Sequence, residues 1–117
     1  MQVTVKHMER DEITGDVIGF TPVAIVDASD FVNHGIEEAL NYAFRYTNNI
    51  NGSWSIQKEF LDTRSGGLFE NGDYNEDVTV LVEREDGLGL RSTSMGDRME
   101  VDGVEYRVAM VGFKEVA

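Results

Sequence analysis

The chain of 117 residues contains no cysteine. This absence excludes disulfide bonds, thiolate nucleophiles and cysteine-based zinc sites. There are only two histidines, His7 and His34, so a histidine-rich metal site is poorly supplied. No apolar run approaches the roughly 20 residues that span a bilayer. The N-terminal residues alternate polar and apolar side chains and lack the apolar stretch of a signal peptide. We therefore expect a cytoplasmic protein that makes no membrane contact.

The common catalytic motifs are also missing. The chain has no P-loop, no Gly-x-Ser-x-Gly, no His-Glu-x-x-His and no Gly-x-Gly-x-x-Gly. Residues 70–77 are rich in carboxylates, but an EF-hand with Gly72 at position six would place Gly67 and Phe69 at ligand positions, where neither side chain can bind calcium. We expect no cofactor, no metal and no catalytic residue. An irregular, weak cation site in this segment stays open as an alternative.

Positive charge is scarce. Ten Lys and Arg stand against 22 Asp and Glu, which gives a net charge of −12. Residues 66–90 alone carry seven acids and one base. A polyanion gains nothing from counterion release, so we expect no direct nucleic-acid binding. The acidity has two interpretations: solubility in a salt-adapted or GC-rich host, or a surface that docks on a basic partner such as a nucleic-acid-binding protein.

The distribution of apolar residues predicts the β-strands. Alternation indicates strands at residues 2–8 and 54–56, and a β-branched run indicates one at residues 23–26. Residues 78–82 are continuously apolar, which is typical of a central strand. Residues 63–77 are rich in Gly, Asn and Asp, and we expect a long loop there.

One segment has the period of an amphipathic helix. Its apolar face is formed by Ile36, Ala39, Leu40, Ala43, Phe44 and Thr47, which predicts a helix over residues 36–48. Asn33 is the expected cap. Tyr42 and Tyr46 lie one turn apart on the flank of this face. They either cover the edge of the core or form a platform for a ligand or partner.

The clearest pattern is C-terminal. Residues 99–116 alternate around Asp102-Gly103, the strongest two-residue turn signal, and predict a β-hairpin. The preceding 91–97 loop contains three hydroxyls, a glycine and an acid. Its side chains either bond to nearby backbone groups, with Gly96 at a positive φ, or form an anion or peptide site around Arg91.

These elements together predict an α+β fold. We expect a single domain over residues 1–117, with a mixed or antiparallel sheet of about five strands packed by one main helix, residues 36–48.

The C-terminal motifs resemble those of a known group of proteins. Residues 90–97 read Leu-Arg-Ser-Thr-Ser-Met-Gly-Asp, followed by Val-Asp-Gly at 101–103, Tyr-Arg-Val at 106–108 and Val-Gly-Phe-Lys-Glu-Val at 111–116. This pattern resembles small proteins of bacteriophages and conjugative elements, including YodL-like domains. Residues 39–54 are similar to proteins of the same kind. The resemblance implies a phage or mobile-element accessory protein and carries no catalytic residue.

We therefore expect a non-enzymatic protein that binds and modulates a host protein in the host cytoplasm, through an acidic surface that imitates DNA in one form of the hypothesis. Self-association stays open. Alternatives are a virion or assembly component, and a ligand-binding or enzymatic domain that uses the 91–97 loop. The candidate partner or ligand residues are Tyr42, Tyr46, Trp54, Arg91, Ser92, Ser94, Asp97, Glu70, Asp73, Glu76 and Asp77.

Overall fold

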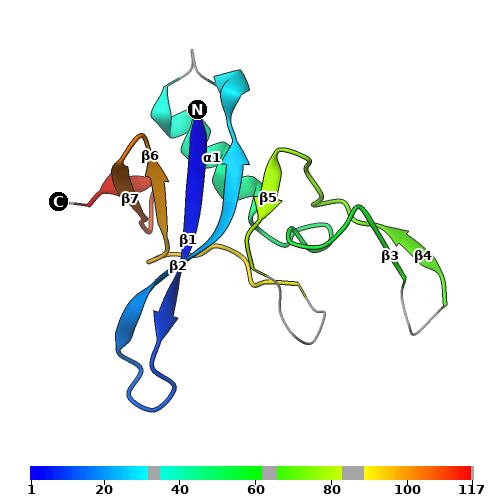
Figure 1. The fold of residues 1–117 in the computed structure, drawn as a ribbon, viewed down its shortest axis with the longest axis horizontal. Coiled ribbons are helices and arrows are strands. Elements are labelled where there is room, and N and C mark those ends of the chain that lie inside the picture. The colour runs from blue at the N-terminus through cyan, green and yellow to red at the C-terminus, as the bar shows by residue number, and fades with distance from the viewer. Residues whose placement is uncertain (32–34, 62–65, 83–88, 117) are drawn as a thin grey trace.

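A computed structural model describes residues 1–31, 35–61, 66–82 and 89–116. Six antiparallel strands form one sheet in the order β5-β2-β1-β6-β7-β8, and β3 and β4 form a separate pair (Figure 1). This is the predicted α+β class. The elements in chain order are β1 Gln2–Arg10, β2 Val17–Asp27, the 3-10 turn η1 Ser29–Phe31, α1 Ile36–Tyr46, β3 Glu59–Leu61, β4 Leu68–Glu70, β5 Val78–Val80, β6 Arg98–Val101, β7 Val104–Val108 and β8 Phe113–Glu115.

The two N-terminal strands form a long hairpin that extends beyond the rest of the sheet (Figure 1). β2 is much longer than the predicted residues 23–26, because the strand continues through Pro22. The register shifts between Val5, which pairs with Ala24, and Lys6, which pairs with Pro22. Val23 is thus the extra residue of a bulge, and a bulge is where a sheet accepts proline.

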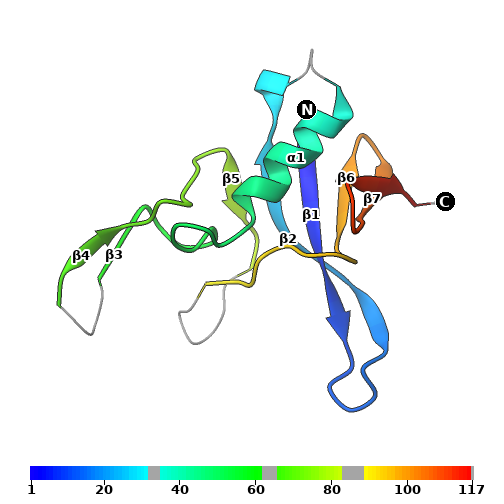
Figure 2. The same cartoon turned by 180° about the vertical axis from the view of Figure 1, so that it is seen from behind.

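Helix α1 covers one face of the sheet (Figure 2). Its buried residues are Ala39, Leu40 and Ala43, which belong to the predicted apolar face. The helix ends at Tyr46, two residues earlier than predicted, because Asn48 turns its side chain back to donate to the Phe44 carbonyl. Gly35, at a φ of 90°, precedes the first turn. Asn33, the predicted cap, lies outside the described residues. No helix in the described ranges is long and apolar enough to cross a membrane.

Two strand predictions and one loop prediction require correction. Residues 78–82 were expected to form a central strand, but β5 is three residues long and lies at the sheet edge, paired only with β2 among the described strands. The expected strand at residues 54–56 is replaced by turns, because Trp54 is buried by packing of its indole rather than by strand pairing. The expected loop at residues 63–77 contains β4, which pairs with β3.

The predicted C-terminal hairpin is confirmed and extended. Asp102 and Gly103 both have positive φ, at 51° and 82°, as a type I′ turn requires. Gly112, at a φ of 70°, then turns the chain into β8, so the region is a three-stranded meander rather than a single hairpin.

Candidate functional site

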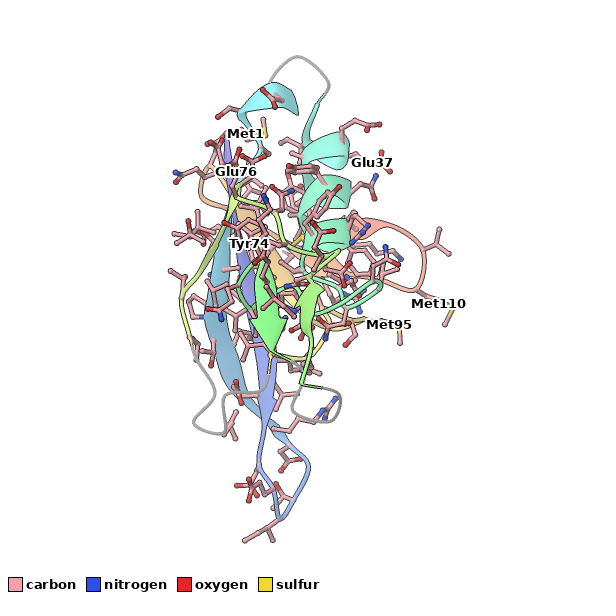
Figure 3. The ribbon with its side chains drawn as sticks, turned by 90° about the vertical axis from the view of Figure 1, so that its right-hand side faces the viewer. Met1, Glu37, Tyr74, Glu76, Met95 and Met110 are labelled. Atoms are coloured by element: carbon pink, nitrogen blue, oxygen red, sulfur yellow. The ribbon has the colours of Figure 1, made fainter. Side chains whose placement is uncertain are left out.

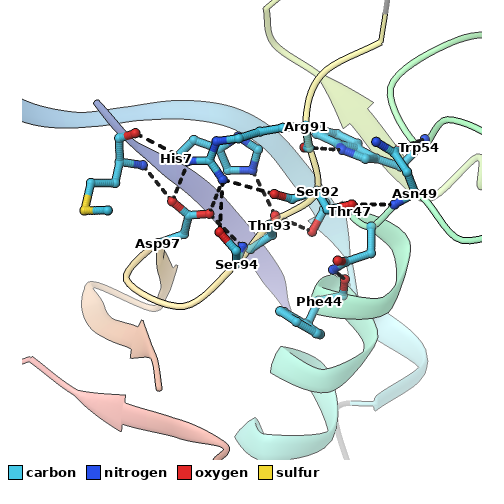
Figure 4. Close-up of polar contacts among 12 residues, drawn as sticks. His7, Phe44, Thr47, Asn49, Trp54, Arg91, Ser92, Thr93, Ser94 and Asp97 are labelled. Carbon is cyan, nitrogen blue, oxygen red and sulfur yellow. Dashed lines mark hydrogen bonds and ion pairs between the residues drawn. The ribbon is translucent and has the colours of Figure 1, made fainter. Parts of the chain in front are cut away.

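The 91–97 loop is organised around one ion pair (Figure 4). The Arg91 guanidinium donates to both carboxylate oxygens of Asp97, at 2.6 and 2.8 Å. The backbone N–H groups of Met8 and Ser94 donate to the same carboxylate, each at 2.8 Å. Burial alone raises the pKa of Asp97, but these hydrogen bonds outweigh it and hold the pKa below its ordinary value. Asp97 therefore joins the loop to β1 as a fully satisfied anion.

This arrangement favours the structural interpretation of the loop. Arg91, the cation that an anion site would need, is already paired with Asp97. The Ser92 hydroxyl accepts from the Asn49 backbone at 2.9 Å, and the Trp54 indole donates to the Arg91 carbonyl at 2.9 Å. Gly96 has the predicted positive φ, at 96°. The loop joins β1 to the segment that follows α1.

A buried series of hydrogen bonds connects this loop to β1 and to the end of α1 (Figure 4). The sequence interpretation did not predict it. His7 Nε2 is 2.9 Å from the Thr93 hydroxyl, which donates to the Thr47 hydroxyl at 2.8 Å. Thr47 in turn donates to the Ala43 carbonyl at 2.7 Å. The sequence does contain a signal for the burial of His7. Residues 2–8 alternate, so His7 lies on the same face of the strand as the buried Val5. Burial, followed by the nearby charge of Arg91, lowers the pKa of His7 to about 4.

Residues 70–77 include two buried polar side chains, those of Asn71 and Asp73. Asp73, a predicted surface residue, is fully buried. It accepts from the backbone of Ile50 at 2.6 Å and of Asn51 at 2.8 Å, and it pairs with Arg45 at 3.3 Å. Burial raises the pKa of Asp73, but the two backbone bonds and Arg45 bring it below its ordinary value. Its carboxylate holds this segment against the residues after α1 and is not available to a partner.

Asn71 makes a second set of bonds across the same junction. Its side-chain oxygen accepts from Ser53 N at 2.9 Å, and its amide nitrogen donates to the carbonyls of Ile56 and Gln57 at 3.2 and 3.1 Å. The Asn71 side chain lies so close to the backbone of Gly52 that a Cβ added there would lie 2.2 Å from its side-chain oxygen. The 71–77 segment is therefore fixed relative to the chain around Trp54.

An open cleft of about 390 Å³ lies where this segment faces the end of α1, and Figure 3 labels two of its residues, Tyr74 and Glu76. The cleft is lined by Tyr46, Lys58, Tyr74, Asn75 and Glu76. These residues offer two aromatic rings, an amide and one charge of each sign. The arrangement can bind a protein side chain by ring contact, hydrogen bonding and charge.

Tyr42 packs against Tyr46 of the cleft lining. Its ring centroid is 5.0 Å from that of Tyr46, its hydroxyl donates to Asp77 at 2.5 Å, and Asn75 donates to that hydroxyl at 2.8 Å. Burial, followed by the bond to Asp77, raises the pKa of Tyr42 to about 12. Of the two tyrosines, Tyr46 lines the cleft, whereas Tyr42 packs against Tyr46.

The predicted site residues fall into separate groups. A ligand-binding or enzymatic domain would bring the two tyrosines together with Trp54 and the residues of the 91–97 loop. In the structure, only Tyr46 of these lines the cleft, and Tyr42 packs against it. The others belong to the 91–97 loop and its buried surroundings: Trp54, Arg91, Ser92, Ser94 and Asp97. Of the acidic candidates, Glu76 lines the cleft, Asp77 bonds to Tyr42, and Glu70 is exposed on β4.

Comparison with protein-family models, with curated proteins and with solved structures finds no match for this chain. Within the described residues, no three His, Asp or Glu side chains are grouped to hold a metal ion. Function must therefore be inferred from the cleft and the surfaces of the fold.

Proposed function

We propose that this chain is a non-enzymatic protein-binding module of a phage or mobile element, and that it engages a basic segment of a host protein in the host cytoplasm. The observation that carries the proposal is the cleft lined by Tyr46, Lys58, Tyr74, Asn75 and Glu76. The resemblance of the C-terminal motifs to phage and mobile-element proteins supports the biological setting.

The lining of the cleft suits an arginine or lysine side chain. Arginine stacks on aromatic faces and pairs with carboxylates, and Tyr74 is 42% exposed beside Glu76. Tyrosine is also enriched among the residues that dominate binding energy at protein interfaces. Lys58, on the same lining, repels the bound cation, so we expect that cation to lie toward Glu76.

The rest of the molecule favours such a partner. The net charge of −12 attracts a basic protein at long range and increases its association rate. The cleft is preorganised, since Asp73 and Asn71 fix one wall and Tyr42 supports the other. A preorganised site loses little conformational entropy on binding. In the DNA-mimic form of this proposal, duplex DNA competes with the chain for the same partner.

A titration tests the proposal directly. An octapeptide of alternating Arg and Gly is the probe, and isothermal titration calorimetry at low salt measures its affinity. We expect Tyr74→Ala and Glu76→Gln each to weaken binding by about tenfold, which corresponds to roughly 1.4 kcal/mol. Glu12→Gln is the matched control, because Glu12 is an exposed acid on the β1–β2 turn and its loss changes the net charge equally. Equal weakening by Glu12→Gln, or no measurable binding, would reject the cleft as the site.

A further inference from the structure

The sheet face opposite α1 carries an unexpected row of basic residues. Lys6 on β1 pairs with Arg98 on β6, Arg98 with Arg107 on β7, and Arg107 with Lys114 on β8. Four of the ten basic residues of the chain thus lie side by side across four adjacent strands. We name Lys6, Arg98, Arg107 and Lys114 the cationic row.

The row faces away from the helix. On each strand the neighbours of the basic residue point to the α1 side: His7 next to Lys6, Met99 next to Arg98 and Val108 next to Arg107 are buried. Phe113, next to Lys114, packs edge-on against Phe44 of α1, at 6.2 Å between ring centroids. Because successive strand residues point to opposite faces, the row lies on the open face of the sheet, which α1 leaves uncovered (Figures 2 and 3).

Placing like charges in this register has a cost. Directly opposed side chains in an antiparallel pair have Cβ atoms about 4.5–5.5 Å apart, and like charges there are destabilising. Acidic residues are abundant in this chain, 22 in all, yet none of the four positions of the row is acidic. Solubility does not explain the row either, since the chain is already strongly charged with the opposite sign.

Only the first half of the row is neutralised. Lys6 pairs with Glu100 at 3.2 Å and with Glu105 at 3.3 Å, and Arg98 pairs with Glu105 at 3.3 Å. Arg107 and Lys114 are exposed, and neither side chain forms a hydrogen bond or ion pair with another described residue. The uncompensated positive charge is therefore concentrated at the β7–β8 end of the sheet.

We propose that Arg107 and Lys114 form a docking site for an acidic, extended peptide segment of a protein partner. Charge complementarity selects the acidic partner. The position of β8 at the end of the strand order selects an extended one, because an edge strand can accept backbone hydrogen bonds from an added strand. Alternate side chains of such a segment would lie on the face that presents Lys114.

A peptide fits this site better than a nucleic acid. The chain carries −12 overall, so a long polyanion meets repulsion from the surrounding acids that two exposed cations do not offset. A segment with two or three carboxylates can stay within about 8 Å of the cations, the screening length at physiological salt. This site is distinct from the Tyr46–Tyr74 cleft, and it is expected to bind acidic rather than basic segments. The experiment below therefore tests it independently of the proposed function.

The test uses a heptapeptide of alternating Ser and Glu with blocked termini, which carries three carboxylates, titrated into the ¹⁵N-labelled protein. We expect the largest amide shifts in residues 105–108 and 113–115, and a double variant Arg107→Gln/Lys114→Gln that binds about tenfold more weakly. The control Arg10→Gln removes one positive charge elsewhere, on β1, and should weaken binding less than Arg107→Gln or Lys114→Gln alone. The Arg107 and Lys114 substitutions remove a like-charge contact, so thermal unfolding should show an unchanged or higher midpoint.

Three outcomes would overturn the proposal. The first is no binding of the three-carboxylate peptide at low salt. The second is weakening by Arg10→Gln equal to that by Arg107→Gln alone, which would indicate a general charge effect. The third is an octathymidylate oligonucleotide that binds the same residues more tightly than this peptide, which would assign the row to nucleic acid instead.

Discussion

Arg91 and Asp97, six positions apart in the sequence, form a two-pronged ion pair with nitrogen–oxygen distances of 2.6 and 2.8 Å. The Asp97 carboxylate is buried, whereas nearly half of the Arg91 side chain is exposed. The buried partner is therefore the more sensitive to substitution. The carboxylate also accepts hydrogen bonds from the backbone N–H groups of Met8 and Ser94, which a substitution at Asp97 would weaken.

Asp97→Asn should destabilise the fold by about 3 kcal/mol, the scale for breaking one side of a buried charged pair. The amide cannot accept four hydrogen bonds as the carboxylate does. Arg91→Lys retains the charge but loses the two-pronged geometry, and we expect a smaller loss. Urea unfolding measures both. If Asp97→Asn is within 0.5 kcal/mol of the parent, a tolerance typical of surface sites, the loop is not held by this pair.

The stability of the fold should decrease as the pH falls from about 6.5 to about 4. The pKa of His7 is lowered to about 4 in the folded protein, below its ordinary 6.5, so the unfolded chain binds the extra proton first. At about 1.4 kcal/mol per pH unit, the loss approaches 3 kcal/mol at pH 4. Below pH 4 the lowered pKa values of Asp73 and Asp97 add a further loss.

Urea unfolding at pH 7, 5.5 and 4.5 measures this loss, with His7→Gln as the control. The variant should show a flatter pH dependence over the same range, because it has no imidazole to protonate. Parallel curves for the two proteins would show that His7 does not contribute.

His7 should be neutral and carry its proton on Nε2. Each threonine hydroxyl has one proton, and those of Thr47 and Thr93 are donated to Ala43 and Thr47 respectively. Thr93 can therefore only accept from His7, which requires a proton on Nε2. Long-range ¹H–¹⁵N spectra at pH 7 distinguish the two tautomers. A signal pattern for a proton on Nδ1 would contradict the assignment of His7 Nε2 as the donor to Thr93.

Gly52→Ala should destabilise the protein much more than Gly19→Ala. A Cβ at Gly52 meets the Asn71 oxygen at 2.2 Å, whereas a Cβ at Gly19 has no atom within 4 Å. Overpacking of this kind costs about 1–3 kcal/mol, and it would also displace one wall of the cleft. Denaturant unfolding and octapeptide binding should therefore both respond at position 52. Equal stability of the two variants would show that the 71–77 segment adjusts freely.

Local sequence patterns predicted the elements whose structure depends on near neighbours. The period of α1 and the Asp102-Gly103 turn are encoded within a few residues, and both are confirmed. The position of β5 at the sheet edge depends on where β2 lies, which alternation alone does not determine. Trp54 alternated with its neighbours as a strand residue would, yet its indole bond to Arg91, 37 residues later, determines its place.

The candidate site was predicted in part for the same reason. The tyrosines of α1 were recognised from helical spacing, and Glu76 from its acidic segment. Asp73 appeared to be a surface acid because its three partners, Arg45, Ile50 and Asn51, are distant in sequence. The cationic row was not predicted, because its members come from four strands whose register is set only by the folded sheet.

The most direct test of the central claim is photo-crosslinking from the cleft. A benzoylphenylalanine introduced in place of Tyr74 should crosslink a basic protein in a bacterial host lysate, and excess Arg-Gly octapeptide should suppress the product. The same group in place of Ile13, which is 95% exposed on the β1–β2 turn, should not yield that product. The same crosslinked proteins at both positions, or a product at Tyr74 that the octapeptide leaves unchanged, would contradict the proposal that the cleft binds a basic segment.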